Sequence, residues 1–266
     1  MVRTNAKLNK GLVGASAVAN AYAQSLREVK QPFSMPTMED LAPWKGKKAL
    51  VYAPHQDDEV LGCGGTIARM VDLGLEVTVA YLTDGRRGSE SMEAGLVQKR
   101  NLEAIAGLKV LGCEAYHFLG FEDGRLEMTE ATLDGVGDVL RGNRPDLVFL
   151  PHITDGPSDH VVTSKLVSEA LRDYPGEAVC FNYEVWNPLQ MTTLVDISEV
   201  MPRKIAALRE HRSQLQMVDY AEKIMGLNAY RSMCTGSCRY CEAFLKLGRK
   251  EQVEFMDQVS KSIKGI

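Results

Sequence analysis

The sequence predicts an α/β fold of the Rossmann-like kind, with a doubly wound, mostly parallel sheet and helices on both faces. From residue 48 onward, short apolar runs alternate with segments of helical periodicity. The apolar runs are nearly continuous, which is typical of parallel strands buried on both faces. With 266 residues and 45% hydrophobic content, the chain is long enough to bury one large core.

The individual elements follow from these two patterns. Runs rich in Val, Leu and aromatic residues predict strands over residues 49–53, 76–82, 115–119, 146–151 and 178–184. Helical periodicity between the runs predicts helices over residues 66–73, 98–108, 132–141 and 161–172. Because such sheets bind ligands outside the carboxyl ends of their strands, we expect a site where these strands end.

The first 46 residues are expected to form an N-terminal extension to a single α/β domain over residues 47–266. A helix over 8–29 is followed by a connector that contains Pro32, Pro36 and Pro43. Basic residues precede a short Ala-rich stretch at 11–19, so secretion is one interpretation of this start. The stretch is short and weakly apolar, and a cytoplasmic location is the favoured interpretation.

Composition excludes several classes of partner. The net charge is −4, and Lys and Arg are scattered rather than gathered into a stripe, so a nucleic-acid partner is not expected. No apolar run approaches the roughly 18 residues that cross a bilayer, so no membrane span is expected. The sequence leaves the oligomeric state open, a homo-oligomer included.

The segment Pro54-His55-Gln56-Asp57-Asp58-Glu59 directly follows the first expected strand. Imidazole nitrogen and carboxylate oxygen are ligands of zinc, and a catalytic zinc keeps three protein ligands and one open position. His55, one of the two aspartates and His160 can supply these ligands, and the other aspartate can act as a base towards a bound water. The residues alone do not decide which aspartate has which role.

The glycines after this turn do not indicate a nucleotide site. Gly62, Gly64 and Gly65 have neither the G-x-G-x-x-G spacing nor the P-loop pattern, and three carboxylates stand where phosphates would approach. We expect these glycines to allow close packing of the following helix.

Polar residues also follow the next three expected strands, and we expect all four groups to converge on one edge of the sheet. The groups are residues 55–59, 83–86, 122–124 and 152–160.

These residues resemble the PIG-L/LmbE-like family of metal-dependent de-N-acetylases, whose signature His-Pro-Asp-Asp-Glu is matched at residues 55–59. The similarity covers about residues 48–245. It continues in family order through Thr83-Asp84-Gly85, Arg100-Asn101-Leu102-Glu103-Ala104, Leu119-Gly120-Phe121-Glu122-Asp123-Gly124, Pro145-Asp146-Leu147-Val148, Asp159-His160, Asp196-Ile197-Ser198, residues 204–214 and Glu242-Ala243-Phe244.

The resemblance implies removal of an N-acetyl or similar acyl group from an amino sugar or sugar conjugate, a small-molecule substrate. It implies that His55, Asp58 and His160 hold a metal, usually Zn²⁺, with Fe²⁺ or another divalent ion as alternatives. It further implies that Asp57 is the general base. Arg100 and Asp123 match positions where relatives contact the substrate.

The chain departs from the family pattern at two positions. Gln56 replaces the usual proline of the signature, at a position that shapes the turn and offers no ligand. Pro157 replaces a histidine that relatives use to stabilise the intermediate or to protonate the leaving amine. Three alternatives follow: Asp57 acts as both base and acid, a nearby group on the substrate side such as His152 has taken over, or the protein is a catalytically impaired sugar- or metal-binding relative.

The remaining cysteines and histidines are interpreted separately. Cys63, Cys113 and Cys180 are expected to be buried, reduced thiols. Cys234, Cys238 and Cys241 have the Cys-x3-Cys-x2-Cys spacing of radical S-adenosylmethionine enzymes, but their position near the C-terminus favours a buried stripe of thiols on one helix face over a disulfide, a second metal or an iron–sulfur cluster. His117, within a strand, and His211, within a helix, are expected to be structural.

Overall fold

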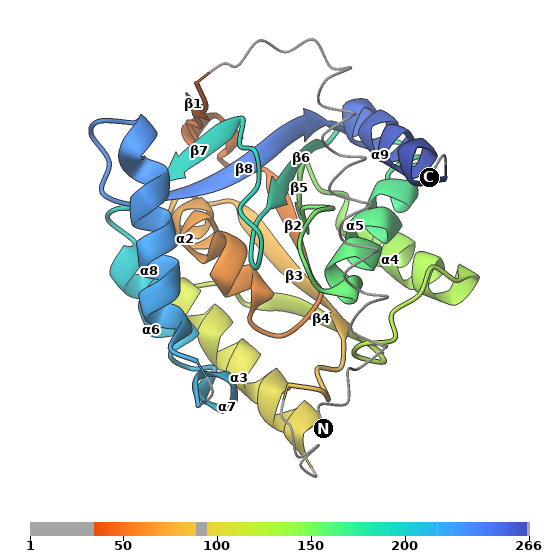
Figure 1. The fold of residues 1–266 in the computed structure, drawn as a ribbon, viewed down its shortest axis with the longest axis horizontal. Coiled ribbons are helices and arrows are strands. Elements are labelled where there is room, and N and C mark those ends of the chain that lie inside the picture. The colour runs from red at the N-terminus through yellow and green to blue at the C-terminus, as the bar shows by residue number, and fades with distance from the viewer. Residues whose placement is uncertain (1–34, 89–94, 217, 265–266) are drawn as a thin grey trace, which may run out of the picture.

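A computed structural model describes residues 35–88, 95–216 and 218–264 of the chain, and this part contains one eight-stranded sheet covered by helices on both faces (Figure 1). The expected helix over residues 8–29 lies outside the described residues. No helix in the described ranges is both long and apolar enough to cross a membrane.

The five expected strands are confirmed as the centre and one edge of the sheet. They are β2 (Lys48–Ala53), β3 (Glu76–Thr83), β4 (Ala115–Phe121), β5 (Leu147–Pro151) and β6 (Val179–Tyr183), all parallel. Three strands were not predicted: β1 (Thr37–Met38), β7 (Thr193–Asp196) and β8 (Cys241–Gly248). The order is β1-β7-β8-β6-β5-β2-β3-β4, with β8 antiparallel to both of its neighbours.

Helices pack on both faces of the sheet, as the doubly wound fold requires (Figure 1). On one face lie α2 (Asp58–Asp72), α3 (Leu96–Leu111), α6 (Met201–Leu208) and α8 (Tyr220–Arg231); on the other lie α4 (Glu130–Asn143), α5 (Ser158–Ala170) and α9 (Arg249–Lys264). The shorter elements are α7 (Arg212–Leu215) and the 3₁₀ helices η1 (Ala42–Trp44) and η2 (Ser232–Cys234).

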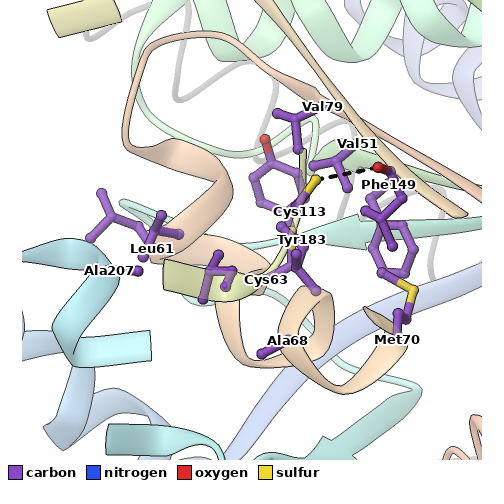
Figure 2. Close-up of a cluster of buried hydrophobic side chains, with 14 of the residues drawn as sticks. Val51, Leu61, Cys63, Ala68, Met70, Val79, Cys113, Phe149, Tyr183 and Ala207 are labelled. Carbon is purple, nitrogen blue, oxygen red and sulfur yellow. Dashed lines mark hydrogen bonds between the residues drawn. The ribbon is translucent and has the colours of Figure 1, made fainter. Parts of the chain in front are cut away.

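Successive residues of the central strands enter two separate cores, one on each face. In β2, Val51 packs into the core beneath α2, and Tyr52 packs into the core beneath α4 and α5. Figure 2 shows the first core, where Cys63 and Met70 of α2 lie in one cluster with Val51 and Phe149 of the sheet. The prediction that Cys63, Cys113 and Cys180 are buried thiols is confirmed.

The first helix begins earlier than its apolar pattern predicts. We expected it from Thr66, but α2 begins at Asp58, immediately after the acidic turn. Carboxylates in the first turn suit the positive end of a helix dipole. The glycines then permit close approach to the sheet, because a Cβ at Gly62 would lie 2.3 Å from Tyr183 Cδ2, and a Cβ at Gly65 would lie 2.7 Å from Ile197.

The expected stripe of thiols on a helix is wrong. Cys234 is exposed in η2, Cys238 is half-buried between elements, and Cys241 is buried at the start of β8. Gly236, with a φ of 68°, lies between them in the left-handed region that glycine favours and a continuous helix excludes. The three cysteines therefore do not share one helix face.

Candidate metal centre

Two histidines and one aspartate from two strand ends meet at the carboxyl edge of the sheet. His55 follows β2, Asp58 begins α2, and His160 lies in the first turn of α5 after β5. Asp58 Oδ2 lies 3.1 Å from His55 Nδ1 and 3.2 Å from His160 Nε2. Their donor atoms all lie within 4.8 Å of one another, so the three residues could hold a metal ion.

Two of the three donor spacings are compatible with a bound metal ion. Two ligand atoms about 2 Å from a tetrahedral ion lie roughly 3.3 Å apart, close to the spacing from Asp58 to both imidazoles. His160 Nδ1 lies 2.8 Å from Asp155 Oδ2, which suits a hydrogen bond donated from Nδ1 and leaves the lone pair on Nε2. That Nε2 atom is buried and makes no hydrogen bond to any described residue, as expected of an atom that faces a metal.

His55 is held from its far side in the same way. Its Nε2 lies 3.2 Å from both Asp123 Oδ1 and Asp159 Oδ2. A proton on Nε2 therefore leaves the lone pair of Nδ1 available to bind a metal ion. His55, Asp123 and Asp159 form a second group with metal-ligand spacing. However, Gly124 N donates to Asp159 at 2.6 Å and Arg87 N donates to Asp123 at 2.8 Å, which is the pattern of supporting carboxylates.

The site attracts positive charge. Burial lowers the pKa of His160, but Asp58 and Asp155 outweigh burial and raise it to about 9. Burial likewise opposes protonation of His55, yet the hydrogen bonds to Asp123, Asp159 and Asp58 hold its pKa well above the ordinary value. Burial would raise the pKa of Asp58, but the two imidazoles keep it below its usual range. Such a field favours a cation at the point where these groups meet.

Asp57 stands next to this group in a strained backbone conformation. Its φ is 146°, a region that residues with a side chain rarely adopt, and strain of this kind concentrates at functional sites. Arg100 Nη2 lies 3.3 Å from Asp57 Oδ1 and also donates to Gln56 O at 3.0 Å. Burial raises the pKa of Asp57 to about 6, and the charge of Arg100 opposes that rise. A carboxylate with this pKa suits a general base near neutral pH.

Glu59, which sequence reasoning left without a role, supports the same turn. It is fully buried, its Oε1 accepts a 2.6 Å hydrogen bond from Tyr81, and its Oε2 accepts one from the backbone N of Asp57. Burial raises the pKa of Glu59 to about 8 despite the Tyr81 hydrogen bond. The residue thereby fixes the conformation that presents Asp57.

A cavity of about 320 Å³ opens over these residues. Its wall includes residues of the turn after β2 and Pro157 before α5, which belong to the expected site. It also includes side chains from segments that carry no recognised motif. The lining residues are His55, Asp57, Asp58, Leu61, Arg87, Gly88, Arg100, Asp123, Pro157, Trp186, Gln214 and Tyr220. The structure therefore brings together residues that follow β2, β3, β4 and β5, as the convergence of strand ends predicts.

Five further residues that the sequence analysis singled out can be compared with this geometry. Pro157 lines the cavity, whereas His152 is fully buried outside its wall, with Nδ1 2.7 Å from the Thr154 hydroxyl. The Gln56 side chain donates to Thr83 O and Asn101 Oδ1, so it shapes the turn as expected. His211 is buried, but the helix expected around it is wrong, because its backbone is non-helical and it precedes α7. His117 lies in β4 and is exposed.

Sequence reasoning missed the residues that support the ligands. Asp155 and Asp159 were recognised only as part of a pattern around His160, although a carboxylate near a ligand histidine in the sequence is a usable signal. Trp186 belongs to the connection between β6 and β7, Gln214 to α7 and Tyr220 to α8, and the approach of all three to the cavity depends on the path of the chain. No local pattern marks Trp186 or Tyr220 as a residue of the site.

Comparison with known proteins shows which family this chain resembles. Residues 50–171 match the family model PIG-L, described as GlcNAc-PI de-N-acetylase. The diacetylchitobiose deacetylase of Thermococcus kodakarensis is 32% identical over 191 residues, which cover 63% of this chain and 70% of that protein. A probable N-acetyl-alpha-D-glucosaminyl L-malate deacetylase of Bacillus cereus is 28% identical over 187 residues, covering 64% and 84%.

The fold is also similar to a solved structure. The N,N'-diacetylchitobiose deacetylase of Pyrococcus horikoshii, determined with an inhibitor, superposes with a TM-score of 0.72 at 26% identity. The superposition covers 87% of this chain and 93% of that chain. The similarity therefore extends well beyond the segment that carries the signature turn.

Proposed function

This chain belongs to the PIG-L family of de-N-acetylases, and on that premise we propose that it is a Zn²⁺-dependent hydrolase that removes an N-acetyl or similar small acyl group from an amino sugar or sugar conjugate. One observation carries the proposal: the buried, unbonded Nε2 of His160 faces Asp58 and His55, beside the strained base candidate Asp57. The relatives named above support the class of substrate.

His55, Asp58 and His160 would hold the ion. Their two nitrogens and one oxygen suit Zn²⁺, and Fe²⁺ would accept the same set. When bound, the ion polarises the amide carbonyl and lowers the pKa of water. Asp155 and the pair Asp123 and Asp159 keep the imidazole tautomers that leave the ligand nitrogens unprotonated.

Asp57 carries the proton transfers in this proposal. It takes a proton from the attacking water, and Arg100 at 3.3 Å stabilises its charged form before the reaction. Pro157 offers no proton, so Asp57 also returns the proton to the leaving nitrogen as the C–N bond breaks. The products are a free amine and a carboxylate. Contact of Arg100 and Asp123 with the substrate remains part of the proposal, and both line the cavity.

The test is release of free amine from a panel of N-acetylated sugars and their conjugates, with metal content measured on the same preparation. We expect one Zn²⁺ per chain and amine release by the wild type but not by Asp57→Asn. Zinc near one per chain with no amine released from any substrate would instead favour the impaired, sugar- or metal-binding relative. Iron and sulfide in an anaerobic preparation would favour the radical chemistry of the cysteine motif.

A further inference from the structure

Trp186 lines the cavity although it is a large apolar side chain with 54% of its surface exposed. It lies in the connection between β6 and β7, and its ring meets that of Tyr220, at the start of α8, edge to face with centroids 6.2 Å apart. Asp58, at the proposed metal site, is by contrast only 2% exposed. The two aromatic rings therefore form an outer wall of the cavity, beyond the reacting groups.

The backbone beneath Trp186 is fixed by a buried carboxylate. Asp155 is 1% exposed, and its Oδ1 accepts hydrogen bonds from the backbone N of Trp186 at 2.7 Å and of Asn187 at 2.8 Å. The Asn187 side chain donates to Thr154 O at 2.7 Å. An exposed aromatic residue on a surface loop needs no such support for stability, so its placement calls for another explanation.

The same loop is fixed at its other end. The backbone N of Leu189 donates to Glu184 Oε2 at 2.7 Å, and Arg231 of α8 pairs with Glu184 and donates to Leu189 O at 3.0 Å. Arg231 and Tyr220 belong to one helix, so a single element fixes the loop and supplies the second ring. The wall is thus preorganised, and preorganisation reduces the entropy lost when a ligand binds.

We propose that Trp186 and Tyr220 bind a second ring of the substrate, joined to the N-acetylated sugar, and that this ring is neutral with an apolar C–H face, as in another pyranose. The inference rests on the proposed function, because the first ring must place its amide at Asp57 and the ligand residues. Aromatic faces bind C–H surfaces, while the hydroxyl groups of such a ring stay in water. The wall formed by Trp186 and Tyr220 carries no charged group that would pair with an anionic second unit.

The first experiment compares substrates that differ only in the second unit: N-acetylglucosamine, its β-1,4-linked dimer, and N-acetylglucosamine linked to an acyclic hydroxy acid. In Trp186→Ala we expect kcat/KM for the dimer to fall about tenfold, and for the other two to change less than twofold. Trp186→Phe should keep most of the preference for the dimer. Equal losses on all three substrates, or no loss on any, would overturn the proposal.

Trp44→Phe is the matched control. Trp44 is the other tryptophan of the chain, and it lies in η1 with its Nε1 donating to Glu39 instead of lining the cavity. This variant should show wild-type kinetics on all three substrates.

A binding measurement separates the two proposals. In a Trp44→Phe and Asp57→Asn double variant, Trp186 is the remaining tryptophan and its fluorescence reports ligand at the wall without turnover. We expect saturable quenching by the dimer, with a Kd at least tenfold below that of N-acetylglucosamine. If the wild type hydrolyses no N-acetylated sugar, the proposed function fails. The titration still shows whether Trp186 and Tyr220 bind a second ring. A dimer that binds no tighter than the single sugar overturns the inference.

Discussion

Asp155 and His160 are joined by a 2.8 Å contact between Oδ2 and Nδ1, while Asp155 Oδ1 holds the backbone of Trp186. One buried carboxylate therefore orients a proposed metal ligand with one oxygen and a wall of the cavity with the other. A carboxylate that fixes the tautomer of a ligand histidine also raises the basicity of the ligand nitrogen. The inner and outer parts of the site share this one residue.

Asp155→Asn is expected to weaken metal binding about 10- to 100-fold. Both oxygens of Asp155 accept hydrogen bonds, and the amide of Asn would replace one of them with an NH₂ donor that faces either His160 or the backbone N–H groups of the loop. The Kd for Zn²⁺, measured by competition with a chromophoric chelator, tests this expectation. Asp138→Asn is the matched control, since Asp138 is exposed on α4 and pairs only with Arg141 among the described residues. An Asp155→Asn variant with the wild-type Kd would mean that the contact does not position the ligand.

Asp57→Asn is expected to lower kcat by about 10²- to 10⁴-fold with little change in metal content, because the amide cannot accept the proton. Metal content by elemental analysis and amine release on one preparation give both quantities. Asp58→Asn should instead lose metal as well as activity. If Asp57→Asn loses its metal, Asp57 would be the metal ligand and Asp58 the base, which is the reverse of the proposed roles.

Lys204→Met is expected to destabilise the protein by about 3–5 kcal/mol, because it leaves Glu242 buried without its counter-charge. Lys204 Nζ lies 2.6 Å from Glu242 Oε1, and both side chains are fully buried. Urea denaturation measures the free energy of unfolding. Lys223→Met removes a pair with Glu222 in which both side chains are well exposed, and it should leave the free energy of unfolding nearly unchanged.

As the pH drops from about 6.5 towards 3, His211 is expected to make a growing unfavourable contribution to stability. Burial lowers the pKa of His211 to about 3, so below its ordinary value of 6.5 the unfolded chain binds a proton that the folded protein does not. The loss is roughly 1.4 kcal/mol per pH unit for this residue. Denaturation of metal-free protein at several pH values should show that His211→Gln loses less free energy of unfolding than the wild type as the pH falls. Equal losses would show that His211 does not contribute.

The central fold was predictable because its signals are local. Residues 49–53 of β2 and all of β5 are apolar, so their burial on both faces follows from composition, and parallel strands place their ends on one edge. His55 and His160 were consequently expected to converge. The antiparallel β8 could not be predicted in this way, because its apolar residues follow a cysteine-rich segment whose spacing also suits a helix.

The outer part of the site depends on long-range packing. Trp186 reaches the cavity because Glu184 and Arg231, 47 positions apart in the chain, pair beneath its loop. No periodicity or motif in either segment indicates that partnership. The start of α2 was missed for a related reason, since its glycines reduce helical propensity locally and only the sheet beneath them explains their place.

Glu242 of β8 receives the backbone N–H groups of Gly65 and Thr66 at 2.8 and 2.7 Å, just after α2 departs from helical geometry at Cys63. The helix that presents Asp57 and Asp58 is therefore completed by a residue almost 180 positions downstream. A chimera that grafts residues 50–171 onto the C-terminal part of a relative would keep the ligands of this chain but would depend on the relative for the anchor. Recombination within the family should succeed where the C-terminal part supplies a glutamate, a lysine and an asparagine in the places of Glu242, Lys204 and Asn228.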